Sequence, residues 1–139
     1  AMFVAYESPV QMFSGNPSDA YPEIGFTTYL ASLPTTWDDI RVLDAKLGDY
    51  LVVARRKDND WYLAAMTDWT AREIKVSLSF LADGKYRALS CEDGINAAKN
   101  ASDYQMGYRM IDNSGHLELK MAPGGGYVVK LIKLDDARP

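Results

Sequence analysis

The feature that most constrains this chain is a succession of short strand-length segments that follows Leu33-Pro34. Beyond Trp37, runs of β-branched and aromatic residues are separated by Gly, Asn or Asp, which favour turns. Such spacing is typical of antiparallel strands that pack as a sandwich or a barrel. The expected strands are 37–46, 50–57, 61–67, 73–80, 85–92, 105–111, 116–121 and 127–134.

One of these segments shows how the strands would be buried. Between Glu73 and Phe80, apolar residues alternate with Lys75 and two serines, so one face of the strand should meet water and the other a core. With 139 residues, of which 47% are hydrophobic, the chain can fill one such core. We therefore predict a mainly β fold, an antiparallel two-sheet β-sandwich.

The first 34 residues follow a different pattern and form a separate leader. Apolar residues recur there at steps of three and four, which is helical spacing, with an interruption at Pro9. A second short helix is expected from Asp19 or Tyr21 to Leu30, with Pro22 in its first turn. We divide the chain into a helical leader, 1–34, and a β domain, 35–139. The leader's apolar stripe, which should find an apolar surface to cover it, comprises Met2, Phe3, Tyr6, Val10 and Phe13.

Composition excludes several kinds of partner and site. The net charge is -4 and no basic run could follow a phosphate backbone, so we expect no nucleic-acid partner. No apolar run approaches the roughly 20 residues of a membrane span, so we expect no membrane partner either. Cys91 and His116 are single residues of their types, which excludes a disulfide framework and the common zinc spacings. We expect no metal or cofactor in this segment.

The segment from Asp58 to Trp69 is rich in aromatic residues and aspartates, the residue types of a carbohydrate site. Trp61, Tyr62 and Trp69 could stack on a sugar ring, which makes an oligosaccharide a candidate ligand. The alternative is a packing role, in which Trp61 faces the core and Tyr62 lines the other surface of the strand. We favour packing, and keep a carbohydrate-binding module as the alternative function.

The carboxylates of the same segment have a structural interpretation as well. Asp58 and Asp60 flank Asn59 in a tight turn, and Asp68 follows a strand, where it could hold a turn by bonding its own backbone. Glycoside hydrolysis needs two carboxyl groups facing each other across a cleft, which this spacing does not indicate. We therefore assign no catalytic residue. Pro123-Gly124-Gly125-Gly126 is expected to be a flexible turn into the last strand.

Several blocks of this sequence resemble a known family. They are "MFVAYESPVQMFS", "TTWDDIRVLDAKLGDYLVVARRKDNDWYLAAMTDWTAREIKVSLSFLADGKYRA", "EDGINAAKNASDY" and "LKMAPGGGYVVKL". In this order they resemble the C-terminal region of glycoside hydrolase family 97, a family of α-glucosidases and α-galactosidases. The first block resembles the last helical stretch of that family's (β/α)8 barrel. The resemblance covers nearly the whole chain, Met2 to about Leu134.

The resemblance implies a non-catalytic accessory domain, since the family's catalytic carboxylates and calcium ligands lie in upstream domains. The parent chain would be an enzyme that hydrolyses α-glucosidic or α-galactosidic bonds, in the periplasm or outside the cell. This segment would stabilise the catalytic barrel or join copies into a homo-oligomer. We accordingly expect Ala1–Pro139 to be a piece of a longer chain.

Overall fold

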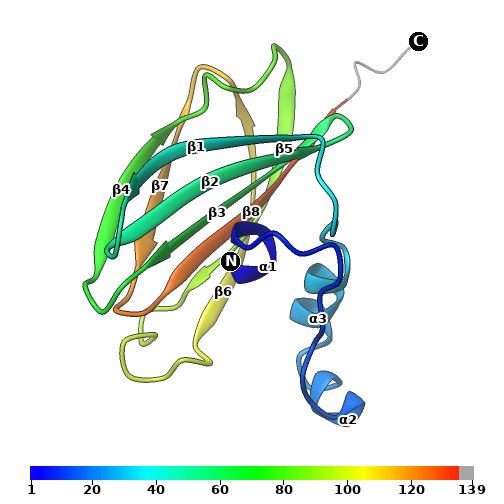
Figure 1. Cartoon of the computed structure of the whole chain (residues 1–139), viewed down its shortest axis with the longest axis vertical. Helices are drawn as coiled ribbons and strands as arrows, with labels where there is room; N and C mark the ends of the chain where they lie inside the picture. The colour runs from blue at the N-terminus through cyan, green and yellow to red at the C-terminus, as the bar shows by residue number, and fades with distance from the viewer. Residues whose placement is uncertain (135–139) are drawn as a thin grey trace.

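The computed structural model describes residues 1–134, which form two antiparallel sheets and three short helices (Figure 1). The mainly β fold is thus confirmed, and the last five residues of the predicted β domain lie outside the described part. The helices are α1 (Met2–Ala5), α2 (Pro17–Ala20) and α3 (Ile24–Ala31). The strands are β1 (Asp39–Lys46), β2 (Tyr50–Lys57), β3 (Asp60–Thr67), β4 (Arg72–Ser77), β5 (Lys85–Asp93), β6 (Tyr104–Asp112), β7 (His116–Met121) and β8 (Gly126–Lys133).

The two sheets differ greatly in size. Sheet A has six strands in the order β1-β2-β3-β8-β5-β6, and sheet B has only two, β4 and β7. The chain leaves sheet A after β3 to form β4, and leaves it again after β6 to form β7. It returns through β8, which is inserted between β3 and β5. β8 therefore joins β1, β2 and β3 to the β5–β6 hairpin in one sheet.

The main core fills the space between the two sheets. Sheet B contributes alternate residues of β7, Leu117, Leu119 and Met121, while Leu63 and Leu131 contribute from sheet A. Alternation along each strand places these side chains on one face. The predicted two-sheet sandwich is confirmed.

A second apolar cluster covers the opposite face of sheet A, which we call the outer face. There Val53, Tyr62 and Val128 pack against Val4 of α1 and Tyr29 of α3. In Figure 1, α1 lies in front of β3 and β8, on the side of sheet A away from β4 and β7. The central strands of sheet A are consequently buried on both faces, as the unbroken buried runs of β2 and β3 show.

The predicted strands agree with the structure except at their ends. β2 and β7 begin and end where expected, and the others shift by a residue or two, apart from β4. β4 was expected to reach Phe80 but ends at Ser77. The reason is a turn, in which the amide of Leu81 donates to the carbonyl of Leu78 at 2.9 Å. Leu78 and Leu81 are still buried in the core.

Helices do lie in the first 34 residues, but they are shorter than predicted. The helix expected from Asp19 or Tyr21 is two helices, and Pro22 lies between them instead of in a first turn. A proline disfavours helical geometry at the residue before it, which accounts for the break. None of the helices within residues 1–134 is long and apolar enough to cross a membrane.

The predicted apolar stripe of the leader is not the face that packs. Because α1 ends at Ala5, the residues that reach the outer face are Val4 and Ala5, with Phe3 partly buried. Tyr6, Val10 and Phe13 lie beyond the helix and are exposed, as is Met2. The leader does fold back onto the sheet, but through a different set of side chains from the predicted stripe.

The loop before β8 is held by a carboxylate. Asp93 of β5 accepts hydrogen bonds from the amide of Ala122, at 2.8 Å, and from that of Gly126, at 3.4 Å. A Cβ atom at Gly125 would lie 1.8 Å from Asp93 Oδ2, so only glycine allows this approach. Gly124 has φ +70°, a conformation that glycine adopts readily. The glycines thus let the loop close around Asp93.

Core packing between the sheets predicts opposite outcomes for two neighbouring residues of β7. We expect Leu119→Ala to lower the free energy of unfolding by about 2–5 kcal/mol, because it leaves a cavity in the core. Glu118→Ala, on the exposed face of the same strand, should change it by about 0.5 kcal/mol or less. Urea denaturation measures both. Equal losses for the two variants would contradict the assigned faces.

The glycine loop predicts a second contrast. Gly125→Ala should lower the free energy of unfolding by about 1.5–3 kcal/mol, because its methyl group displaces the Asp93 carboxylate from its amide donors. Gly25→Ala is the matched control, since nothing lies within 4 Å of its Cβ and alanine favours the helix. Thermal unfolding of both variants provides the measurement. A Gly125→Ala protein as stable as the parent would show that the loop does not depend on Asp93.

Candidate functional site

The carboxylates of Asp38 and Asp60 hold the backbone in and around the β2–β3 turn. Asp58 adopts φ 54°, and its amide donates to Asp38 Oδ2 at 2.7 Å. Lys57 Nζ lies 3.2 Å from the other oxygen of Asp38. The amide bond from Asp58 and the Lys57 ammonium together lower the pKa of Asp38. Asp60 Oδ1 accepts a hydrogen bond from the amide of Lys133 at 3.0 Å, which fixes the end of β8.

Asp68 is also engaged, in the turn between β3 and β4. Its Oδ1 accepts from the amide of Thr70 at 2.8 Å and pairs with Arg72. These bonds, with that to Arg72 the larger effect, lower the pKa of Asp68 to about 2. The predicted turn-holding role is therefore confirmed. A carboxylate held ionised in this way does not carry the proton that a general acid must donate at neutral pH.

Arg72 links this turn to the β1–β2 hairpin. Its Nη2 lies 3.5 Å from Asp49 Oδ2, and its guanidinium lies over the ring of Tyr50, 5.3 Å from the centroid. A groove of about 590 Å³ opens beside these residues and is also lined by Tyr6 of the leader and Leu47. The charged groups of the groove thus already have partners within the fold.

The structure places the three candidate sugar-contacting aromatics in three different environments. Trp61 is buried in the main core, edge-on to Phe80 with ring centroids 5.1 Å apart. Tyr62 is buried on the outer face, edge-on to Trp37 at 5.2 Å. Burial, the largest effect, and the nearby Asp60 and Asp58 raise the pKa of Tyr62 to about 12. The packing interpretation of these two residues agrees with the structure.

Trp69 alone remains open to solvent, with 87% of its surface exposed. Its ring stands beside the backbone of Gly124, where a Cβ atom would lie 3.1 Å from ring atom Cζ3. Trp61, Tyr62 and Trp69 therefore do not form a shared platform. A sugar could stack on Trp69 alone, without help from the other two.

Arg55 is a structural residue that the sequence analysis did not single out. It is buried on the outer face, and its Nη2 donates to the carbonyl of Ala5 at 3.2 Å. Its guanidinium also lies 5.8 Å from the ring centroid of Trp37, and 3.8 Å separates Nη1 from Glu7 Oε2. The sequence does contain a signal for this role. Arg55 lies two positions after Val53, and so on the same face of a strand whose preceding residues are apolar on both faces. Arg55 joins the leader to β2.

A second link between leader and sheet runs through α3. Tyr29 Oη donates to the carbonyl of Leu89 on β5 at 3.1 Å. The ring of Phe26 packs at a tilt against Tyr104 of β6 with centroids 5.2 Å apart, and the Tyr104 hydroxyl donates a hydrogen bond to Glu23. The leader is thus held on the outer face at β2, at β5 and at the start of β6.

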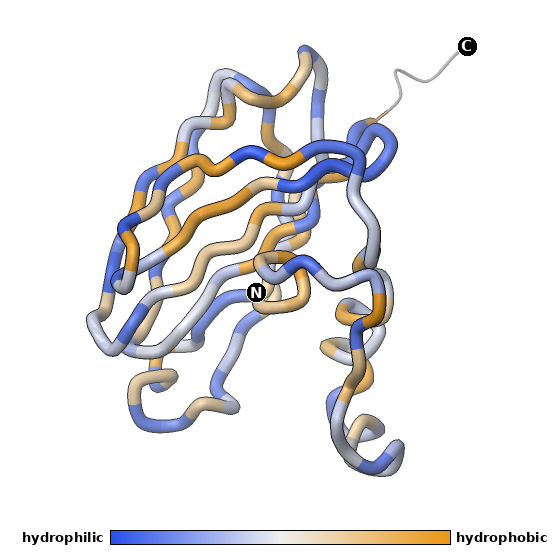
Figure 2. The backbone as a smooth tube through the Cα atoms, viewed as in Figure 1, coloured by the Kyte–Doolittle hydropathy of each residue, from blue (hydrophilic) through white to orange (hydrophobic). Residues whose placement is uncertain are grey.

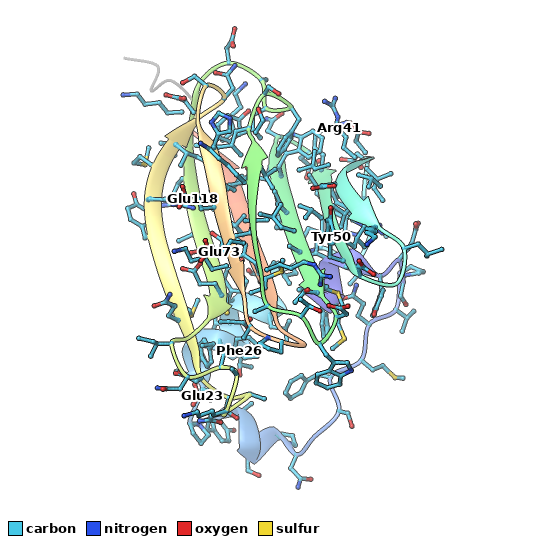
Figure 3. The ribbon with its side chains drawn as sticks, turned by 90° about the vertical axis from the view of Figure 1, so that its left-hand side faces the viewer. Glu23, Phe26, Arg41, Tyr50, Glu73 and Glu118 are labelled. Atoms are coloured by element: carbon cyan, nitrogen blue, oxygen red, sulfur yellow. The ribbon has the colours of Figure 1, made fainter. Side chains whose placement is uncertain are left out.

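The two exposed faces of the sandwich differ sharply in character. Sheet B presents charged residues to solvent, and Lys120 Nζ lies 3.6 Å from Glu73 Oε1 across its two strands. Figure 3 shows Glu73 and Glu118 on this side of the molecule. The residues that give sheet B this charged face are Glu73, Lys75, Glu118 and Lys120.

The outer face of sheet A instead carries exposed apolar residues on both sides of the leader, together with the cations Arg87 and Lys130. On β1, where Figure 2 shows hydrophobic and hydrophilic residues alternating, Ile40 and Val42 are exposed opposite Arg55 and Val53 of β2. On β6, at the other edge, Met106, Tyr108 and Met110 are exposed. Exposed apolar patches of this kind mark interaction sites. The outer face is thus the strongest candidate for a functional surface.

A family comparison identifies the β domain. The model of the family described as "Glycosyl-hydrolase 97 C-terminal, oligomerisation" matches residues 36–132. A retaining alpha-galactosidase of Bacteroides thetaiotaomicron is 43% identical over 131 residues, which are 94% of this chain and 20% of that protein. The chain therefore spans about a fifth of the length of this curated relative.

Solved structures show the same arrangement over nearly the whole chain, leader included. A glycoside hydrolase family 97 enzyme from Pseudoalteromonas sp. strain K8, in complex with acarbose, superposes with TM-score 0.91 and 35% identity. A variant of that enzyme in complex with panose gives TM-score 0.93 and 33% identity. Each match covers 96% of this chain and 22% of the enzyme. Because the family model matches well over half of the residues, this chain belongs to the glycosyl-hydrolase 97 C-terminal, oligomerisation family, as an accessory domain of a glycoside hydrolase.

Proposed function

We propose that this chain is the non-catalytic C-terminal part of an α-glycosidase, which supports the catalytic domain and joins copies of the enzyme. The observation that carries the proposal is the contrast between the two faces of the sandwich. Sheet B presents charged side chains to solvent, whereas the outer face of sheet A exposes apolar side chains at both edges and already holds the leader. The catalytic domain would lie on the outer face, beside the leader that is continuous with it.

The leader supports this arrangement energetically. Its short helices are fixed to the sheet by buried contacts of Val4 and Tyr29 and by the hydrogen bond from Arg55 to Ala5. Fully burying an apolar side chain is worth about 1.5–3 kcal/mol. Met2, Val10 and Phe13, which are exposed, would gain that burial against the rest of the enzyme. The leader would therefore be the end of the catalytic barrel.

The aspartates support a non-catalytic role. Asp60, Asp68 and Asp93 each accept hydrogen bonds from backbone amides and hold strand ends or turns. Retaining and inverting glycosidases both need two carboxyl groups aimed at one glycosidic bond. The proposal therefore places the reaction in the remainder of the enzyme. Its substrates would be α-galactosides or α-glucosides, and the name of the 43% identical relative favours α-galactosides.

Calcium and the cellular location belong to the same proposal. Within residues 1–134, no group of three or more His, Cys, Asp or Glu side chains could hold a metal ion. We propose, as the resemblance to family 97 implies, that upstream domains of the enzyme hold calcium. We also propose that the enzyme acts in the periplasm or outside the cell, as its resemblance to family 97 implies.

A carbohydrate-binding module remains the second candidate, and the exposure of Trp69 is the observation in its favour. Exposed aromatic rings can stack on apolar faces of ligands. This candidate ranks lower because Trp61 and Tyr62, its other two proposed contacts, are buried on opposite faces of β3.

The first prediction from this function concerns activity. The chain should hydrolyse aryl α-galactosides and aryl α-glucosides no faster than buffer, because its carboxylates are engaged in structural bonds. Release of the aryl group, followed spectroscopically, is the measurement. Turnover that is lost in Asp60→Asn or Asp68→Asn, but kept in the exposed control Glu118→Gln, would contradict the non-catalytic assignment.

The second prediction separates the two candidate functions. Titration with panose, a sugar bound by one of the similar enzymes, should leave the tryptophan fluorescence of the chain unchanged. Trp61 is buried in the core and Trp37 is partly buried against Tyr62, so a stacked sugar would act on Trp69, which is exposed. Saturable quenching that disappears in Trp69→Ala, together with panose binding by Trp69→Tyr in isothermal titration calorimetry, would favour the carbohydrate-binding module instead.

A further inference from the structure

β6 is an edge strand without the usual protection against pairing. It closes one side of sheet A and pairs with β5 in unbroken register from Tyr104 to Asp112 (the yellow strand at the left of Figure 3). It contains neither proline nor lysine, and its charged residues are Arg109 and the terminal Asp112. Natural edge strands are normally blocked by such residues, by bulges or by shortness. β6 therefore offers a row of free backbone donors and acceptors.

The opposite edge of sheet A shows what such protection looks like. β1 carries an irregularity in its register between Val42 and Asp44, and charged side chains occur along its length. β4 and β7, the strands of sheet B, are short and present the charged face described above. Among the strands within residues 1–134, β6 thus stands out as a long, regular edge.

β6 also carries an apolar row. Met106, Tyr108 and Met110 are spaced by two residues and therefore share one face of the strand. Their partners across β5 include Cys91 and Leu89, which pack in the outer-face cluster. Tyr108 is 63% exposed, and its hydroxyl donates to Met110 Sδ at 3.5 Å. Nothing within the described residues covers this row.

We propose that β6 pairs antiparallel with β6 of a second copy, so that sheet A continues across a two-fold axis into its partner. This inference rests on the proposed function, because it names the surface through which the domain joins copies of the enzyme. The edge of another strand can form hydrogen bonds with the whole row of free amides and carbonyls at once. Apolar side chains of a partner cannot form these bonds. The family description also includes oligomerisation.

The sequence of β6 is self-complementary for this pairing. A two-fold interface places the same patch of both copies in contact. In an antiparallel pair, directly opposite residues share a face, so the period of two brings one apolar row against the other. With Tyr108 at the axis, Met106 faces the partner's Met110. Both rows then form one apolar band on the outer face.

A charge placed in the middle of β6 tests the proposal. Tyr108→Lys sets two ammonium groups against each other at the axis and should raise the dimer dissociation constant by about a hundredfold. Val42→Lys is the matched control, because Val42 is also 63% exposed and lies on the outer face at the opposite edge. Sedimentation equilibrium of the 139-residue chain and both variants measures the constants. Unchanged circular dichroism and melting temperatures confirm that the variants fold.

The outcomes distinguish this inference from the function on which it rests. A dimer that is lost in Tyr108→Lys and kept in Val42→Lys supports pairing through β6. If the dimer stays intact in Tyr108→Lys, the β6 inference is wrong, but the proposed joining of copies still stands and must use another surface. A chain that is monomeric at every concentration overturns both.

Hydrogen exchange provides an independent measurement that does not depend on a variant. In the dimer, the β6 amides that point away from β5 should exchange more slowly than in the diluted monomer, because the second copy accepts their hydrogen bonds. The β1 amides that point away from β2 should exchange equally fast in both states. Fast exchange of the outward β6 amides in the dimer would contradict strand pairing, even if side chains of β6 lay in the interface.

Discussion

The rest of the structure depends on the burial of the central strands of sheet A on both faces. Residues of β3 alternate between the main core, as Leu63 does, and the outer-face cluster, as Tyr62 does. A sheet apolar on both sides must be covered on both sides. Sheet B covers one face and the leader covers the middle of the other. Sheet B and the short helices are stabilised chiefly by their apolar contacts with the two faces of sheet A.

The sequence predicted the β architecture well because turn residues and alternation are local signals. The segments 50–57 and 116–121 agree with β2 and β7 at both ends, and the alternation of Trp61 and Tyr62 between faces agrees with their burial. The leader was harder because its short helices are set by tertiary contacts. Tyr29 is buried because it reaches Leu89, a residue 60 positions away, and no helical spacing indicates that partner.

For the candidate site, the sequence predicted mainly that the aspartates are not catalytic and that the aromatic residues serve packing. Asp58 and Asp68 lie in turns, as their neighbours indicated, while the Asp93 carboxylate could not be connected with Gly125 from sequence. Trp69, named with Trp61 and Tyr62 as a possible sugar contact, stands apart from them in solvent beside Gly124. The proposed function rests instead on exposed apolar residues of the edge strands. Their significance depends on strand order, which the sequence does not specify.

The bond from Arg55 to the carbonyl of Ala5 has a consequence for how such enzymes diverge. A buried guanidinium in the β domain finds its acceptor in the backbone of the preceding segment. A chimera that joined this β domain to a foreign barrel would bury the cation without a matching acceptor, which is costly. Shuffling by recombination near residue 35 is therefore disfavoured. The leader, which we propose is the end of the barrel, and the β domain should be inherited together, as one evolutionary unit that crosses the boundary between them.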